Sequence, residues 1–160
     1  MPKIHLTTPI AAPIARVFDL ARSIDLHRIT STETDERAIG GRTSGLIKLH
    51  ETVTWRAKHL GIYQNLTSII TEMERPYLFT DEMVKGAFKS IKHVHTFKER
   101  DGITEMVDEF NYESPLGILG YAADYIFLTN YMTAFLTKRN QKIKKYAEGD
   151  EWIKILNIHS

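Results

Sequence analysis

The sequence of 160 residues lacks cysteine, has only five prolines and contains no long hydrophobic run. The lack of cysteine excludes disulfides, cysteine-ligated zinc and cysteine nucleophiles. No stretch of about 18 apolar residues occurs, and the first residues lack the continuous apolar segment of an export signal. We therefore expect no membrane span and a cytoplasmic location. The sequence also has no large excess of positive or negative charge, because 21 basic and 20 acidic side chains leave a net charge of +1. This balance argues against a nucleic-acid partner.

The composition that is present is that of an ordinary globular chain, with 42% hydrophobic and 26% charged residues. A chain of this length buries roughly 70% of its unfolded surface, so it needs no disulfide or metal to fold. No internal repeat or linker divides it. We predict one domain over residues 1–148 and a C-terminal tail over residues 149–160.

Glycine and proline divide the chain into predicted elements. A first strand over residues 3–10 is followed by two small helices, one after Pro13 and one capped by Ser23. An antiparallel meander then runs through residues 46–60, 62–74, 77–84, 88–100 and 103–114. A helix over residues 118–147 follows, and its basic residues between 138 and 145 are expected to form a solvated end. This order predicts an α+β domain whose sheet curves around one long helix.

The same order resembles the helix-grip fold of the START-related (SRPBCC) superfamily, specifically its polyketide cyclase/dehydrase and lipid transport group. The clearest carriers of the resemblance are residues 10–20, 45–59, 66–72, 79–83, 93–97 and 112–117. The resemblance implies a curved seven-stranded antiparallel sheet around the C-terminal helix, with two short helices between strands 1 and 2. It also implies a cavity between sheet and helix. Members of the superfamily bind lipids, sterols or polyketides, and a minority catalyse cyclisation or dehydration.

Alternation along each strand indicates which side chains face the concave side of the sheet. In the strand over residues 62–74 the opposite parity, which carries Tyr63, Ile69 and Met73, stays open. The helix is expected to close the cavity with Tyr121, Tyr125, Leu128, Met132 and Phe135. The predicted inward residues of the strands are Glu51, Val53, Trp55, His59, Gln64, Leu66, Phe79, Asp81, Met83, His93, His95, Met106, Asp108 and Phe110.

This predicted inward face mixes apolar side chains with acids and histidines. A buried, unpaired charge is very costly, so these groups must pair, be protonated or face a hydrated cavity. A mostly apolar pocket with a few convergent polar groups is typical of a small-molecule site. For Glu51, Asp81 and Asp108 the alternative of a strand-end position in water or in a salt bridge stays open.

His93 and His95 lie on one face of a strand and suit a shared metal ion, with Glu51, Asp81 or Asp108 as a further ligand. Nothing in the sequence fixes that third ligand. We therefore predict no metal site and no cofactor.

These patterns are compatible with three functions. The favoured one is binding of a hydrophobic or amphipathic small molecule that resembles a lipid, sterol or polyketide, by a monomer or weak homodimer. The second is a cyclase or dehydratase in which His93 or His95 and one of Asp81, Asp108 and Glu51 transfer protons. The third is a stress-regulatory interaction module that uses the apolar residues 152–158, although folding of this tail back on its own domain is the favoured interpretation.

Overall fold

The computed structural model describes residues 2–114 and 121–157, and for residues 121–125 it describes the backbone only. Two short helices follow the first strand, and two further helices end the described chain. The strands are β1 (Lys3–Ile10), β2 (Arg37–Gly41), β3 (Thr52–His59), β4 (Ile62–Glu74), β5 (Leu78–Lys85), β6 (Ser90–Arg100) and β7 (Ile103–Glu113). The helices are α1 (Ile14–Ala21), α2 (Ile24–Thr30), α3 (Tyr121–Glu148) and α4 (Trp152–Asn157), with a 3-10 turn at Thr32–Thr34.

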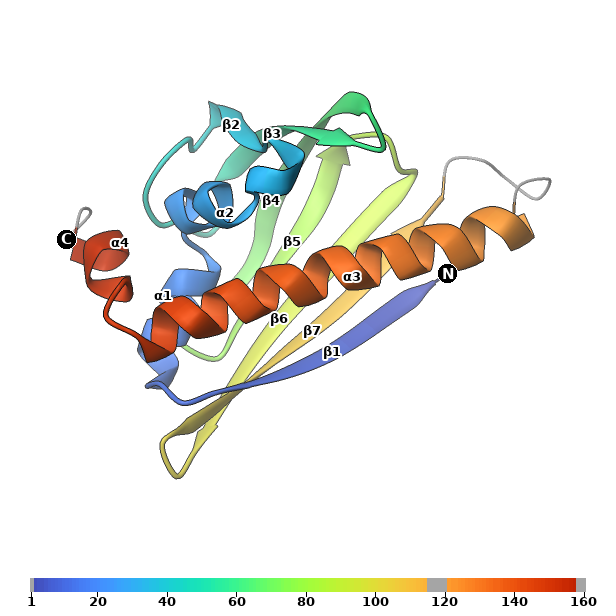
Figure 1. The fold of residues 1–160 in the computed structure, drawn as a ribbon. Coiled ribbons are helices and arrows are strands. Elements are labelled where there is room, and N and C mark those ends of the chain that lie inside the picture. The colour runs from blue at the N-terminus through green and yellow to red at the C-terminus, as the bar shows by residue number, and fades with distance from the viewer. Residues whose placement is uncertain (1, 115–120, 158–160) are drawn as a thin grey trace.

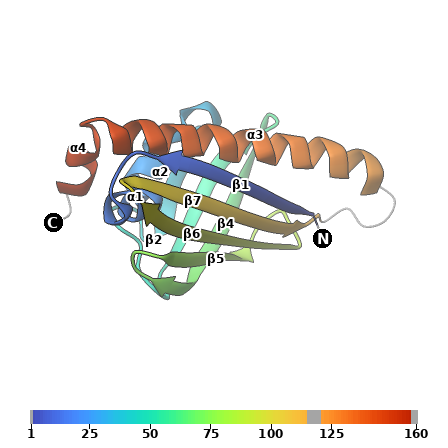
Figure 2. The same cartoon turned by 90° about the horizontal axis from the view of Figure 1, so that it is seen from below.

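All seven strands form one antiparallel sheet in the order β1-β7-β6-β5-β4-β3-β2. The long helix α3 crosses one face of the sheet, and α1 and α2 lie near its carboxyl-terminal half (Figure 1). The view from below shows α3 running beside β1 (Figure 2). The predicted α+β architecture is confirmed. None of the described helices has the length and hydropathy of a membrane span.

The strand expected over residues 46–60 is shorter in the structure, because its first residues pair with the chain between α1 and α2 instead. The backbone N–H of Ile47 donates to the carbonyl of Arg22, and Leu46 bridges to Ser23. Glu51 lies in the turn before β3. The resemblance implied seven strands, but the position of β2 was not predicted from the residues, because Gly40 and Gly41 were interpreted as a break between strands. Gly41 has a φ of +67°, and a Cβ there would lie 2.2 Å from the carbonyl oxygen of Thr52.

The larger hydrophobic core lies where α1 meets the sheet. The buried ring of Phe18 packs edge-on against Phe79 and Phe97, with ring centroids 5.4 and 5.2 Å apart. Helix α4 joins the same core through the buried Ile155, and the guanidinium of Arg16 lies 3.9 Å from the ring centre of Trp152. Residues 152–157 thus fold back onto their own domain.

The amino terminus of α2 depends on a single side-chain cap. The Ser23 hydroxyl oxygen accepts a hydrogen bond of 3.1 Å from the Leu26 N–H, and Ser23 is buried. We expect Ser23→Ala to lower the free energy of unfolding by about 1 kcal/mol, because the N–H loses its partner. Urea denaturation measures the loss, and Ser23→Thr, which keeps a hydroxyl, is the control. Equal stability of Ser23→Ala and the unaltered protein would show that the cap is unimportant.

Candidate functional site

A cavity of about 410 Å³ lies between the sheet and α3. Its walls come from the α1–α2 junction, from strands β3 to β7 and from the middle of α3. Most of the wall is apolar and rich in aromatic rings. The aromatic lining residues are Trp55, Phe79, Phe88, Phe110, Phe127, Tyr131 and Phe135.

Many side chains that strand parity placed on the inward face do line this cavity. They are Val53, Trp55, His59, Gln64, Leu66, Phe79, Asp81, His93, His95 and Phe110 from the sheet, with Leu128, Met132 and Phe135 from α3. In β4 the lining parity runs from Gln64 to Ile70, and a bulge near Glu72 then lets Met73 pack against the core. Whether these residues bind a ligand stays a prediction.

The other predicted site residues lie elsewhere. Met106 is buried in the larger core, Met83 packs in a smaller core cluster, and Asp108 lies behind the cavity wall. Tyr121 and Tyr125 fall outside the described side chains.

The placement of Glu51 on the inward face is wrong. Because the strand begins only at Thr52, strand parity does not extend to Glu51. Its carboxylate instead forms a two-pronged ion pair with the guanidinium of Arg42 and accepts the backbone N–H of Lys48. The Arg42 guanidinium is the main cause that lowers the pKa of Glu51. Glu51 therefore fixes the turn that leads into β3.

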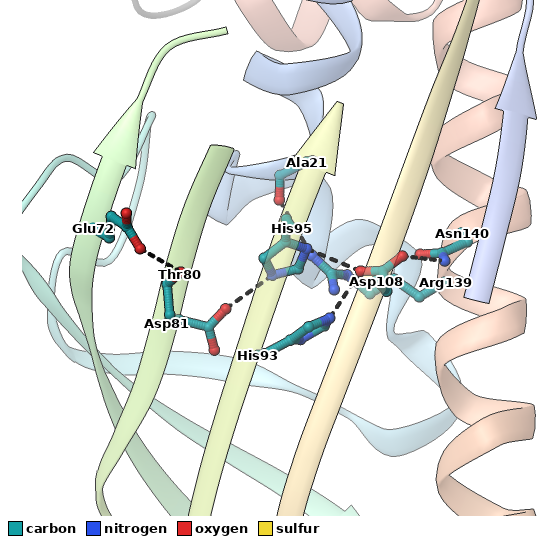
Figure 3. A network of polar contacts seen from close by, with 9 residues as sticks. All are labelled: Ala21, Glu72, Thr80, Asp81, His93, His95, Asp108, Arg139 and Asn140. Carbon is teal, nitrogen blue, oxygen red and sulfur yellow. Dashed lines mark hydrogen bonds and ion pairs between the residues drawn. The ribbon is translucent and has the colours of Figure 1, made fainter. Parts of the chain in front are cut away.

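Four other polar residues of the predicted inward face meet in one network (Figure 3). The strand register brings Asp81 opposite His93, and His95 opposite Asp108. One oxygen of Asp108 lies 2.8 Å from Nε2 of His93 and 2.9 Å from Nδ1 of His95. On the other side, Nε2 of His95 lies 2.9 Å from Asp81. The second oxygen of Asp108 accepts a 2.7 Å hydrogen bond from the Asn140 amide on α3.

The position of His95 between two carboxylates favours its charged form. Burial opposes that charge, but the hydrogen bonds to Asp108 and Asp81 outweigh burial and raise the pKa of His95. Hydrogen bonds from His93 and His95 overcome burial at Asp108, whose pKa falls well below its usual range. The hydrogen bond from His95 likewise overcomes burial and lowers the pKa of Asp81. In its charged form His95 donates from both ring nitrogens.

The neighbouring imidazole of His93 is kept neutral. Burial is the largest cause that lowers the pKa of His93, and the charge of His95 acts in the same direction. The two rings lie 3.8 Å apart between centroids. Because Asp108 has no proton to give, Nε2 of His93 carries the proton of their hydrogen bond. The network thus favours a positive ring at His95 between two negative carboxylates.

Neither a protein-family model nor a curated protein matches the sequence. Solved structures do match. The TTHA0849 protein of Thermus thermophilus is 16% identical, with a TM-score of 0.76 over 91% of this chain and 97% of that chain. A START superfamily protein from Mycobacterium smegmatis is 9% identical, with a TM-score of 0.70 over 91% and 97% of the two chains. The Zhui aromatase/cyclase from Streptomyces sp. R1128 is 10% identical, with a TM-score of 0.70 over 92% and 93%. The chain has the helix-grip fold.

The cavity of this helix-grip domain is also lined by a buried, positively charged side chain that was not predicted from the sequence. Arg139 was expected on a solvated helix end, yet it is buried, lines the cavity and donates a 3.2 Å hydrogen bond to the carbonyl of Ala21. Its charge contributes to the lowered pKa of Asp81. The signal that could have found it is its helical spacing from Met132, Phe135 and Leu136, which lie on the same stripe.

A second polar group on the wall of the helix-grip domain joins α2 to the segment before β2. The Nε2 atom of His27 lies 2.9 Å from Glu36, and the His27 ring stacks on Trp55 at 4.3 Å. Burial opposes the charge of Glu36, but His27 lowers the pKa of that carboxyl. Nearby, Nδ1 of His59 lies 2.7 Å from the Tyr131 hydroxyl oxygen. Of these residues only Trp55 and His59 were predicted from the sequence. Strand parity says nothing about α2 or loops, and the predicted lining of α3 did not include Tyr131.

Proposed function

We propose that the protein binds a hydrophobic or amphipathic small molecule in the cavity between the sheet and α3. The cavity itself carries this proposal: its volume of about 410 Å³ lies within the range of small-molecule sites, which is about 300–1,000 Å³. Aromatic rings make up much of its wall, and a few polar groups converge on it. Two of the similar structures are described as a START superfamily protein and an aromatase/cyclase, which supports a small-molecule function here.

The distribution of polar groups favours an amphipathic ligand over a purely apolar one. Asp81, His95 and Arg139 hold charge on one part of the wall, and Gln64 and His59 add neutral hydrogen-bonding groups on another. The ligand would place its apolar part against Trp55 and the phenylalanines. A lipid-like, sterol-like or polyketide-like molecule with one or two oxygen groups fits this arrangement.

Filling the cavity tests the proposal. Ser68 is buried in β4 and lines the cavity, so Ser68→Phe should place a ring inside it. We expect binding of the fluorescent apolar probe anilinonaphthalene sulfonate to weaken by at least about tenfold, because about 1.4 kcal/mol of contact is lost with the occupied space. Fluorescence titration measures the affinity, and native mass spectrometry of gently purified protein looks for a retained ligand.

The matched control is Ile69→Phe, on the next residue of β4 and the opposite face of the sheet. It should leave probe binding unchanged. Equal binding by both variants and the unaltered protein would place the probe outside the cavity and contradict the proposal. Circular dichroism checks that both variants are folded.

Catalysis is a second candidate, and one contact favours it. The Asp81 side chain is 26% exposed and is hydrogen-bonded to the buried His95. A charged imidazole beside a carboxylate at a cavity wall can give a proton to a carbonyl oxygen of a bound substrate. Turnover of a bound carbonyl compound, detected by mass spectrometry of the recovered ligand, would separate this candidate from binding alone.

A further inference from the structure

Three metal-ligating side chains converge on the cavity wall. One carboxylate oxygen of Asp81 and one ring nitrogen from each of His93 and His95 all lie within 4.8 Å of one another. Each of the three residues lines the cavity. The third ligand, which the sequence left open, is supplied by the strand next to β6, because the register sets Asp81 opposite His93.

The two imidazoles are held by a single carboxylate behind them. Asp108 contacts Nε2 of His93 and Nδ1 of His95 (Figure 3). Asp108 is itself fixed by the Asn140 amide at 2.7 Å. Metal-ligating histidines almost always donate their second ring N–H to a carboxylate, a backbone carbonyl or water, which fixes the tautomer and the ring orientation. This arrangement leaves Nδ1 of His93 and Nε2 of His95 as the nitrogens available to a cation.

We propose that Asp81, His93 and His95 bind a divalent first-row transition metal ion, whose remaining coordination positions open to the cavity. Two imidazoles and one carboxylate form a ligand set that such ions accept with open positions for water or substrate. The ion takes the place of the proton that joins His95 to Asp81, and that proton leaves to solvent.

The local charges are compatible with a dication. The carboxylates of Asp81 and Asp108 supply two negative charges beside the two imidazoles. The guanidinium of Arg139 acts on Asp81 from nearby and opposes the cation. A site formed this way binds less tightly than a closed structural zinc site, which has four protein ligands.

The experiment uses the full chain without an affinity tag, stripped of metal by a chelator. Calorimetric titration with zinc chloride should show one ion per chain, and cobalt chloride should produce visible absorption bands from a nitrogen- and oxygen-ligated ion. Asp81→Ala should weaken zinc binding by at least about 10–100-fold, the loss known for weaker, outer partners of metal sites. The Asp81 side chain is partly exposed, so this variant is expected to fold.

His59→Gln and Glu36→Gln are the matched controls, because they remove a histidine and an acid from the same cavity but lie outside the three-residue group. Both should keep the zinc affinity. The proposal is overturned if zinc binds with equal strength to Asp81→Ala and the controls, or if less than one ion binds per chain. Should Asp81→Ala not fold, Asp81→Asn keeps the side-chain shape and must show the same loss. The apolar probe is titrated into the metal-free protein, so its result does not depend on the ion.

Discussion

Replacement of Asp108 by asparagine is expected to lower the free energy of unfolding by roughly 3–5 kcal/mol, the loss typical of breaking a buried ion pair on one side. Asp108 is 1% exposed and is contacted by donors from His93, His95 and Asn140. An asparagine has one acceptor oxygen in place of two and turns an N–H₂ group toward those donors. The charged His95 also loses one of its two counter-charges.

Urea denaturation at neutral pH measures this loss. The control is Glu109→Gln on the neighbouring residue of β7, whose carboxylate forms a longer, exposed ion pair with Lys3 and lies 3.7 Å from the exposed ring of His5. Exposed pairs contribute little, so the control should lose less than about 1 kcal/mol. Similar losses in the two variants would mean that the buried network does not stabilise the fold.

Acid should unfold the protein steeply, because the network keeps its carboxylates ionised. The pKa values of Asp108 and Asp81 are lowered in the folded state. Their contribution to stability is therefore complete above about pH 3.9, the ordinary aspartate value, and is lost as the pH falls through the folded values. His93, whose pKa is also lowered, begins to act in the same direction below about pH 6.5.

His95 has the opposite sign. Its pKa is raised in the folded state, so its contribution is complete below about pH 6.5 and is lost as the pH rises through the folded value. We therefore expect stability to be greatest between the acidic range, in which protonation of Asp81, Asp108 and His93 destabilises the fold, and the range above about pH 6.5, in which the contribution of His95 is lost. On either side the slope should reach about 1.4 kcal/mol per pH unit for each proton exchanged on unfolding.

Urea denaturation between about pH 3 and pH 9 tests this profile. Glu109→Gln should leave the shape of the pH profile unchanged. Asp108→Asn should make the loss of stability at acidic pH less steep, because the network then has one carboxylate fewer. A stability that stays level from neutral pH down to about pH 3 would contradict the assigned protonation states. Nuclear magnetic resonance of the ring protons gives an independent reading, since His95 should titrate at higher pH than His93.

Alternation along the strands predicted much of this site. Because β5, β6 and β7 are regular, the parity of Asp81, His93, His95 and Asp108 could be read from the sequence. The contacts among them could not, since they depend on the register between strands. That register places Asp108 behind the two imidazoles rather than beside them.

Side chains outside the regular strands were missed for physical reasons. Glu51 was misplaced because Leu46 and Ile47 pair with the α1–α2 junction and residues 48–51 form a turn, in which the N–H of Glu51 donates to the carbonyl of Lys48. Arg139 was assigned to solvent because a basic run usually is solvated, yet its position on the helix turns it inward. His27 and Glu36 approach the cavity only through tertiary packing, on which local patterns carry no information.

Helix α3 is anchored at its carboxyl-terminal end. There Ala147 is fully buried and accepts a 3.0 Å hydrogen bond from Arg16, and the carboxylate of Glu148 accepts the backbone N–H of Ala11. Toward the other end, Ile126 and Phe127 are more than half exposed, and Phe127 lines the cavity. Movement of that end would change the cavity wall at Phe127 and leave the contacts of Ala147 and Glu148 in place. We expect the proposed ligand to exchange through a sub-global opening at that end, whose free energy is only part of that of unfolding, so exchange rate and overall stability can change independently in evolution.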